Sequence, residues 1–236
     1  MDIAGAAAVG RTGWTPRRLG ALLGWYDAFL QQSGTVTVVS DRSGNGYDLF
    51  PTGGVTFSMT RWNANRPAFR FNPTNYISSS DPGIAGFVTG SNVPVTLMQV
   101  IDTTASGARK YMACWQLQPT SGTFETYVET TENFEVDETS GGGGPTGTAS
   151  AIGRHAFIMS FDGSVLTTYV DGFVDIDHVS FGAVIVASNQ FAFGTNAVGA
   201  NGFNGSLAEL VVVPRAISTA EAMAFTEYAR SKWGGF

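Results

Sequence analysis

Oxygen-bearing side chains in one short turn have the spacing of a calcium-binding loop. Asp41, Ser43 and Asn45, followed by Gly46, occupy the first, third, fifth and sixth places of such a loop. The twelfth place holds Thr52, where a calcium loop uses a glutamate that binds through both oxygens. The same residue types also form plain turns. The sequence therefore leaves two interpretations open, calcium bound at these side chains or a turn without metal.

A second group of residues has the types that bind sugars. Aromatic rings pack on the C–H faces of a sugar, and asparagine amides both donate and accept hydrogen bonds to its hydroxyls. The candidate glycan-binding residues lie in two segments that we expect to be loops: Trp62, Asn63, Asn196, Asn201 and Asn204. Asparagine also suits turns with left-handed backbone, so ordinary turns are the alternative interpretation.

The remaining chemistry-bearing residues exclude several kinds of site. His155 and His178 are the two histidines, and neither has a partner at metal-ligand spacing. Cys114, the single cysteine, excludes an internal disulfide and is expected to be a small buried apolar residue. The sequence contains no nucleophile elbow, P-loop or dinucleotide fingerprint, so no cofactor is predicted. A net charge of −6 with 13 scattered Lys and Arg residues argues against nucleic-acid partners.

The composition predicts one large all-β domain that positions these residues. The chain has 236 residues with 30 Gly, 17 Phe and only 14% charged residues, which favours short strands separated by tight turns. No apolar run reaches the ~18 residues of a membrane span. Strands are predicted at 35–39, 55–59, 68–72, 95–102, 110–116, 124–129, 134–137, 155–161, 165–170 and 173–177.

The last three of these strands have the strongest local signals. Asp-Gly pairs at 162–163 and 171–172 predict two tight turns, and hence an antiparallel meander. Alternation within 155–161 predicts one core face and one partly covered face. Along 173–177 the same alternation places Asp175 and Asp177 on a face that we expect to be solvated.

Both ends of the chain carry helix signals. Thr15 before Pro16 predicts a short helix or helical turn with Thr15 as its N-cap. Near the other end, residues 211–213 are β-branched and predict a core strand that Pro214 ends. Ser218 and Glu221 then have capping-box spacing, which predicts a C-terminal helix. We expect Trp233, at the end of this helix, to seal the core.

Strings near both ends of the chain occur together in one family. They are Leu-Gly-Trp-Tyr-Asp-Ala at 23–28, Asp-Arg-Ser-Gly-Asn-Gly at 41–46, Arg-Pro at 66–67, Leu-Ala-Glu at 207–209 and Lys-Trp-Gly at 232–234. In this order they resemble concanavalin A-like lectin/glucanase domains of the laminin G-like type. The resemblance implies a two-sheet antiparallel jelly-roll sandwich. Val39, where a tryptophan is usual, and Asn72-Pro73, where Asp-Gly is usual, depart from the pattern.

The expected organisation follows from this resemblance. Residues 14–236 form the single jelly-roll domain, and residues 1–13 form an N-terminal arm. The arm either packs on a neighbouring subunit or is a frayed terminus. Residues 140–147 are rich in glycine and contain a proline, so we expect a mobile surface loop and no strand there.

The resemblance also calls for a comparison with the catalytic motif of enzymes that share this fold. Laminarinase-like relatives of this fold carry Glu-x-Asp-x-x-Glu on one strand, and Glu135 and Asp137 match its first two positions. Ser140 stands where the second glutamate is required. Loss of a general acid removes a factor of about a hundred to ten thousand from the rate. We therefore predict that the chain is not an enzyme. Glycoside hydrolysis is the least supported of three functional hypotheses.

Two hypotheses of a non-catalytic function remain. The first is a structural protein on the surface of a bacteriophage virion, a capsid decoration or tail-associated protein that is made in the host cytoplasm and contacts other virion proteins or further copies of itself. It is motivated by the low charge, the single domain and residues 1–10, which lack the basic segment of a signal peptide. The second is an extracellular carbohydrate-binding module for cell-surface or environmental glycans.

Overall fold

The computed structural model describes most of the chain. The described residues are 13–28, 34–53, 55–62, 66–88, 90–104, 110–117, 121–137, 144–181, 184–185, 188–195, 202–234 and 236. For residues 34, 56–62, 66, 90–91, 116–117, 121–123 and 184–185 the description covers the backbone alone.

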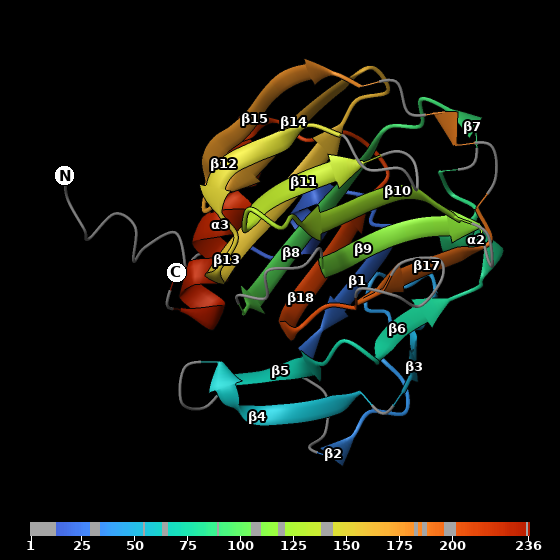
Figure 1. The fold of residues 1–236 in the computed structure, drawn as a ribbon, viewed down its shortest axis with the longest axis vertical. Coiled ribbons are helices and arrows are strands. Elements are labelled where there is room, and N and C mark those ends of the chain that lie inside the picture. Colours follow the sequence, from blue (N-terminus) through green and yellow to red (C-terminus); the bar gives the residue numbers. More distant parts are fainter. Residues whose placement is uncertain are drawn as a thin grey trace.

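Two antiparallel sheets stack face to face, which confirms the predicted jelly-roll sandwich (Figure 1). The larger sheet runs in the order β15 (Phe173–Ser180), β14 (Val165–Val170), β13 (Gly153–Phe161), β8 (Val95–Thr103), β18 (Gly205–Val213), β5 (Arg66–Phe71), β4 (Thr56–Trp62) and β2 (Gly34–Thr35), with β1 (Gly24–Asp27) also beside β18. The smaller sheet runs in the order β12 (Thr146–Ser150), β11 (Asn133–Asp137), β10 (Ser121–Val128), β9 (Lys110–Leu117), β17 (Gln190–Phe193), β6 (Tyr76–Ser79) and β3 (Phe50–Thr52). A separate pair is formed by β16 (Val184–Ile185) and β7 (Gly90–Ser91).

Strand β18 lies at the centre of the larger sheet. Along one edge it pairs with β8, and along the other it pairs first with β5 and then with β1. All of its residues are buried, as its run of apolar and β-branched residues predicts. The strand therefore joins segments from the start, the middle and the end of the chain.

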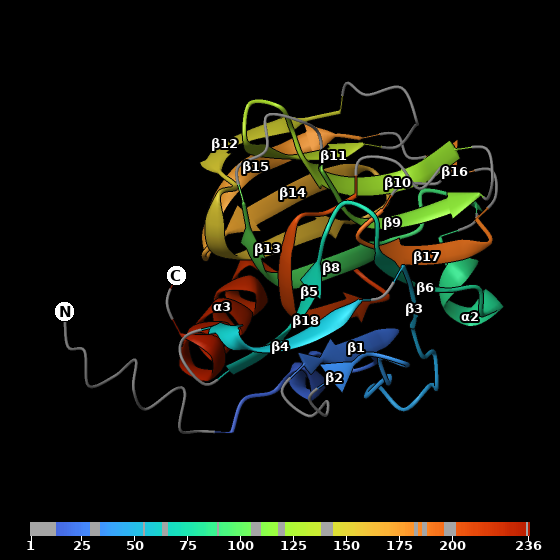
Figure 2. The same cartoon turned by 60° about the horizontal axis from the view of Figure 1, so that its bottom comes forward.

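Three short or medium helices accompany the sheets. Helix η1 (Pro16–Leu19) is a 3-10 turn at the predicted place, although the Thr15 side chain makes no capping hydrogen bond. Helix α2 (Pro82–Ala85) follows β6, and α3 (Thr219–Trp233) begins with the predicted capping box of Ser218 and Glu221. Figure 2 shows α3 against one side of the larger sheet. No helix among the described residues has the length and apolar character to cross a membrane.

Aromatic side chains fill the space between the two sheets. Phe134 of β11 stacks on Phe157 of β13 with ring centroids 4.3 Å apart, and Phe124 of β10 packs against Phe161. The indole of Trp115 is also buried and donates to the Ile84 carbonyl over 2.7 Å. These contacts fix which side chains of each strand face inward.

The predicted meander of three antiparallel strands is confirmed. Strands β13, β14 and β15 pair in sequence, with Asp171 and Gly172 at positive φ in the second turn.

Two predictions about other segments were wrong. The strand expected at 35–39 is a two-residue strand followed by a bridge between Val39 and Leu49, and β12 begins at Thr146 inside the segment expected to be a loop. The part of that loop at 138–143 lies outside the described residues.

Asp175 differs from its predicted solvated position. Its carboxylate Oδ1 accepts hydrogen bonds from the backbone N–H groups of Thr148 and Ala149, each over 2.8 Å. These donors belong to β12, the outermost strand of the opposite sheet. Asp175 therefore links the two sheets at this edge, whereas Asp177 is exposed as predicted.

A partly buried histidine, His155, ties the second turn of the meander to β13. His155 Nδ1 lies 2.9 Å from Asp171 Oδ2, and Nε2 lies 3.1 Å from the Ile152 carbonyl oxygen. Burial lowers the pKa of His155, but the hydrogen bonds to Asp171 and Ile152 outweigh it and raise the pKa above its usual value of 6.5. The protonated imidazole is thus the form that this site stabilises.

We expect the free energy of unfolding to depend on pH through His155. Because its folded-state pKa is raised, the stabilisation is complete below about pH 6.5 and is lost as the pH rises through the folded pKa. Urea unfolding at pH 6 and pH 8 should give a higher midpoint at pH 6, and His155→Gln should reduce that difference. The control His178→Gln should retain it, and equal effects of the two variants would contradict the assignment.

Candidate functional site

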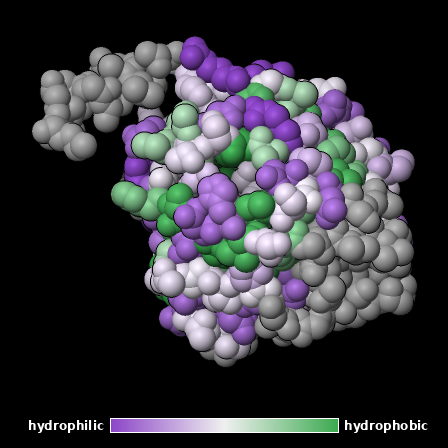
Figure 3. Space-filling model, turned by 90° about the horizontal axis from the view of Figure 1, so that it is seen from above, coloured by the Kyte–Doolittle hydropathy of each residue, from purple (hydrophilic) through white to green (hydrophobic). Residues whose placement is uncertain are grey.

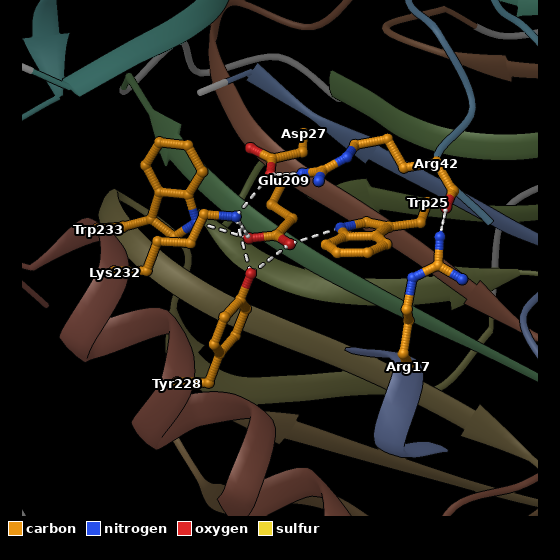
Figure 4. Close-up of polar contacts among 8 residues, drawn as sticks. All are labelled: Arg17, Trp25, Asp27, Arg42, Glu209, Tyr228, Lys232 and Trp233. Atoms are coloured by element: carbon orange, nitrogen blue, oxygen red, sulfur yellow. Dashed lines mark hydrogen bonds and ion pairs between the residues drawn. The ribbon is translucent and has the colours of Figure 1, made fainter. Parts of the chain in front are cut away.

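A buried carboxylate on the outer face of the larger sheet accepts hydrogen bonds from donors on two other segments, β1 and α3. Glu209 of β18 is fully buried, and Figure 4 shows its neighbours converging on it. Oε1 accepts from Trp25 Nε1 over 2.7 Å and from Tyr228 Oη over 2.9 Å. Oε2 accepts from Trp233 Nε1 over 2.7 Å and from Lys232 Nζ over 2.9 Å. Four donors therefore satisfy both oxygens.

A second carboxylate completes this ion cluster. Asp27 of β1 is opposite Glu209 in the strand register and accepts from Lys232 Nζ over 2.8 Å and from Arg42 over 2.5 Å. The Arg42 guanidinium also lies over the Trp25 ring, 4.4 Å from its centroid. One ammonium and one guanidinium thus balance two buried carboxylates, which is the condition for burying charge at acceptable cost.

Electrostatics agree with this closed arrangement. Burial raises the pKa of Glu209 above its usual value, against the opposing effect of the Lys232 ammonium. Burial, and then the Glu209 carboxylate, raises the pKa of the Tyr228 hydroxyl, which keeps it protonated as a donor. Because the donors and acceptors of this cluster form hydrogen bonds and ion pairs with one another, we interpret the cluster as a structural anchor and not as a ligand site.

The turn predicted to bind calcium is part of the same anchor. Asp41 Oδ1 accepts from the N–H groups of Trp25 and Ser43, and Oδ2 accepts from the Ser43 hydroxyl and the Tyr47 N–H. Asn45 donates its amide to the carbonyls at positions 22 and 23. Within the described residues, no group of three or more His, Cys, Asp or Glu side chains is placed to hold a metal. Calcium here stays a prediction, and the observed bonds are those of a turn fastened to β1.

Two of the candidate sugar residues, Trp62 and Asn204, lie at opposite ends of β5. Trp62 is the last residue of β4 and pairs with Arg66 at one end of β5, whereas Asn204 precedes Gly205, which pairs with Phe71 at the other end. The length of β5 thus separates them, roughly 17 Å for an extended strand. Asn204 uses its carbonyl to accept from the Thr104 N–H and hydroxyl. Asn63, Asn196 and Asn201 lie outside the described residues.

The outer face of the smaller sheet carries polar side chains that sequence reasoning did not combine. Tyr111, Glu125, Tyr127, Glu135 and Asp137 are each 6% exposed or less. The strand register places Tyr127 opposite both Tyr111 and Glu135, and Glu125 opposite Asp137. Their neighbours along the strands, such as Phe124 and Phe134, face the core, so these five point away from it. We call this set the acidic tyrosine face.

Hydrogen bonds and ring contacts organise the acidic tyrosine face. The Tyr127 hydroxyl donates to Glu135 Oε1, and the Thr146 hydroxyl donates to Glu135 Oε2 over 3.0 Å. The Tyr111 and Tyr127 rings lie 5.4 Å apart between centroids. Two carboxylates, Glu125 and Asp137, face each other directly across β10 and β11.

The strand register places a further carboxylate beside the incomplete catalytic motif. The motif fails along β11 because position 140 is a serine, a residue outside the described part of the chain. Glu125 nevertheless supplies a carboxylate beside Asp137 from the neighbouring strand. A pair of carboxylates is the basic requirement of glycoside hydrolysis, and the motif along a single strand does not include Glu125.

Cys114 borders the same face. It is buried as predicted, and its Sγ donates to the Thr195 carbonyl over 3.0 Å. Burial, and then the Glu125 carboxylate, raises the pKa of the Cys114 thiol well above its usual value. The thiol therefore stays protonated and unreactive as a nucleophile.

Comparisons with known proteins identify the fold family. A sequence model described as the concanavalin A-like lectin/glucanases superfamily matches residues 98–223, more than half of the chain. A search of curated protein sequences finds no match.

Solved structures at low identity share the fold. Trypanosoma rangeli sialidase with the inhibitor DANA is 13% identical with a TM-score of 0.63, over 87% of this chain and 32% of the sialidase chain. Domain 4 of AbnA, a GH43 arabinanase of Geobacillus stearothermophilus in complex with arabinotriose, is 15% identical with a TM-score of 0.63, over 87% of this chain and 98% of that domain. The binding domain of botulinum neurotoxin DC with rat synaptotagmin II is 8% identical with a TM-score of 0.63, over 88% of this chain and 51% of that one. The chain thus spans about a third of the sialidase but the whole of the arabinanase domain.

The anchor should dominate the stability of the domain. Glu209→Ala removes the acceptor of four donors and leaves Lys232 without one of its two carboxylates, so we expect a loss of about 3–5 kcal/mol in the free energy of unfolding. The control Glu227→Ala removes the half-exposed partner of Arg230 on the same helix and should cost at most about 1 kcal/mol. Urea unfolding measures both, and similar losses would contradict the anchor role.

Proposed function

The chain belongs to the concanavalin A-like lectin/glucanases superfamily, and we propose that it is a non-catalytic binding domain that recognises a glycan through the acidic tyrosine face. The observation that carries the proposal is the pair of buried carboxylates, Glu125 and Asp137, opposite each other on neighbouring strands. Carboxylates are rarely buried in folded proteins, and polar groups that break this rule lie at functional sites more often than elsewhere.

The chemistry of this face suits sugars. Carboxylates accept hydrogen bonds from vicinal hydroxyls, and tyrosine combines an apolar ring with a hydroxyl that donates and accepts. Because Tyr127 and its neighbours are buried, a glycan must displace part of the chain to reach them, so we expect slow association. The arabinanase domain of similar size, solved with arabinotriose, supports an oligosaccharide as the ligand.

A glycan array that includes arabino-oligosaccharides tests the proposal. We expect specific binding that Glu125→Gln and Tyr127→Phe each weaken about tenfold to hundredfold, the loss of a hydrogen bond to a charged or strongly polar partner. The melting temperature of each variant is measured beside the binding, so that a loss of binding is read only from a folded protein. The control Glu227→Gln, on α3, should bind as the wild type does.

Two outcomes would overturn this proposal. If no glycan binds, or if both variants bind as the wild type does, the acidic tyrosine face is not the site. If bound glycans are cleaved and Glu125→Gln abolishes the release of reducing sugar, the domain is a glycosidase that uses Glu125 and Asp137.

A role as a virion surface protein is the second candidate, and an exposed edge strand favours it. On β15, which ends the larger sheet, Phe173 is 76% exposed, and Val174 and Val179 are 45% and 38% exposed. Figure 3 shows hydrophobic residues among hydrophilic ones on the face seen from above, the side where Figure 1 places β15. Edge strands with apolar side chains pair with further chains. Assembly of copies through β15, on a virion lattice, would cover them.

Light scattering after size exclusion tests this second candidate. We expect the wild type to self-associate and Phe173→Asp to remain a monomer, because a charge at the edge opposes strand pairing. Met223→Asp is the matched control, since Met223 is a similarly exposed apolar residue on α3 and should not affect assembly. A monomeric wild type, or dissociation by both variants, would reject assembly through β15.

A further inference from the structure

Strand β15 (Phe173–Ser180) is the longest open edge among the described strands. At its opposite end the larger sheet finishes with β2, which has two residues, and the smaller sheet finishes with β3, which has three. Pro51, at the centre of β3, has no N–H to donate to a further strand. These two short edges therefore offer little to a partner chain.

The other long edge, β12 (Thr146–Ser150), is closed by a side chain. Asp175 Oδ1 accepts from the N–H groups of Thr148 and Ala149, each over 2.8 Å. A further strand on β12 would have to displace this carboxylate. Of the edges that the structure describes, β15 is thus the long one without such a cover.

Apolar side chains of β15 stay exposed in a single copy of the chain. Phe173 and Val174, side by side at the start of the strand, are both exposed. The pairing of β15 with β14 shifts its register near Asp175 and again before Val179, so a regular ladder on this edge is short. A partner therefore gains mainly by covering Phe173 and Val174. Because the single copy leaves them exposed, the segment that covers them belongs to another molecule.

The N-terminal arm has the composition of such a segment. Residues 1–12 lie outside the described part of the chain, and the stretch from Ile3 to Val9 consists of apolar residues and glycine without a charge. The two β-branched residues favour extended pairing. The small residues between them permit a close approach of main chain to main chain.

The base of the arm lies close to the open edge. Trp14 packs on Tyr228 and Phe225 of α3, with ring centroids 5.2 and 6.3 Å apart. The same helix contacts the turn before β15, because Arg230 donates to the Asp171 carbonyl over 2.7 Å. A single helix, about 10–12 Å across with its side chains, therefore joins the base of the arm to the start of β15.

Reach and symmetry make a second copy of the chain a suitable partner. Residues 3–13 span up to about 36 Å when extended, enough to cross one helix diameter and to run along several residues of a strand. Since the base of the arm and the edge are close within one copy, a twofold axis beside them places each arm next to the β15 edge of the other copy.

We propose that residues 3–9 of one copy bind the β15 edge of a second copy and cover Phe173 and Val174. The proposal rests on the assembly through β15 proposed above, and it names the segment that makes the contact. The exchange is reciprocal, so each copy donates one arm and receives one.

A mixture of two defective variants tests the exchange in the full chain. Ile3→Asp combined with Val9→Asp charges the arm and leaves β15 intact, whereas Phe173→Asp charges the edge and leaves the arm intact. By light scattering, the arm variant should raise the dissociation constant of self-association about a hundredfold, as expected when two apolar side chains leave a contact. At millimolar concentration an equimolar mixture of the two variants should form heterodimers, because an intact arm meets an intact edge.

A chain with all three substitutions is the control. Mixed with Phe173→Asp it should stay monomeric, because neither molecule has an intact edge, and thermal unfolding checks that every variant is folded. A monomeric wild type rejects both this proposal and assembly through β15. An arm variant that associates as the wild type does rejects the arm and retains assembly through β15. Stronger association of the arm variant means that the arm covers its own edge, and a mixture that stays monomeric excludes the exchange. Either result rejects the proposal.

Discussion

The hydrogen bonds to Glu209 are the constraint on which the rest of the structure depends. This carboxylate is fully buried and is satisfied by donors from β1 and from α3. Without it, two tryptophan N–H groups would lose this acceptor and the Lys232 ammonium would lose one of its two carboxylates. Because both oxygens require donors at fixed positions, β1 and α3 have a single register relative to β18. The ends of the chain are thereby fixed to its central strand.

This constraint gives the two outer faces of the sandwich different roles. On the larger sheet, α3 and the segment before it cover the strands (Figure 2), and the Ser160 hydroxyl holds that segment on the sheet by accepting from the Ile217 N–H over 3.1 Å. The smaller sheet has no helix of this length against it among the described residues, and its outer face carries Glu125, Glu135 and Asp137. A helix therefore covers part of the outer face of one sheet, whereas carboxylates lie on the outer face of the other.

Local signals in the sequence predicted the features that depend on neighbouring residues. The Asp-Gly turns of the meander and the capping box of α3 are settled within four residues, so their types and spacing suffice. The sandwich itself was predicted from strings at both ends of the chain, and the anchor gives their physical reason. Trp25, Asp27, Glu209, Lys232 and Trp233 belong to those strings and contact one another directly.

The candidate sites could not be predicted in the same way, because strand register decides them. Between Glu125 and Tyr127 the pairing of β10 with β9 shifts by one residue, so that Tyr111 lies opposite Tyr127. A bulge of this kind leaves no mark in the alternation of apolar and polar residues. Glu125 is twelve positions before Asp137, and the pairing of β10 with β11 makes them neighbours. The positions of Trp62 and Asn204 in the sequence likewise do not show whether the two residues are neighbours in the sheet. The structure places them at opposite ends of β5. Functional chemistry on a sandwich thus follows from which strands pair and in what register, a long-range property that residue types alone do not specify.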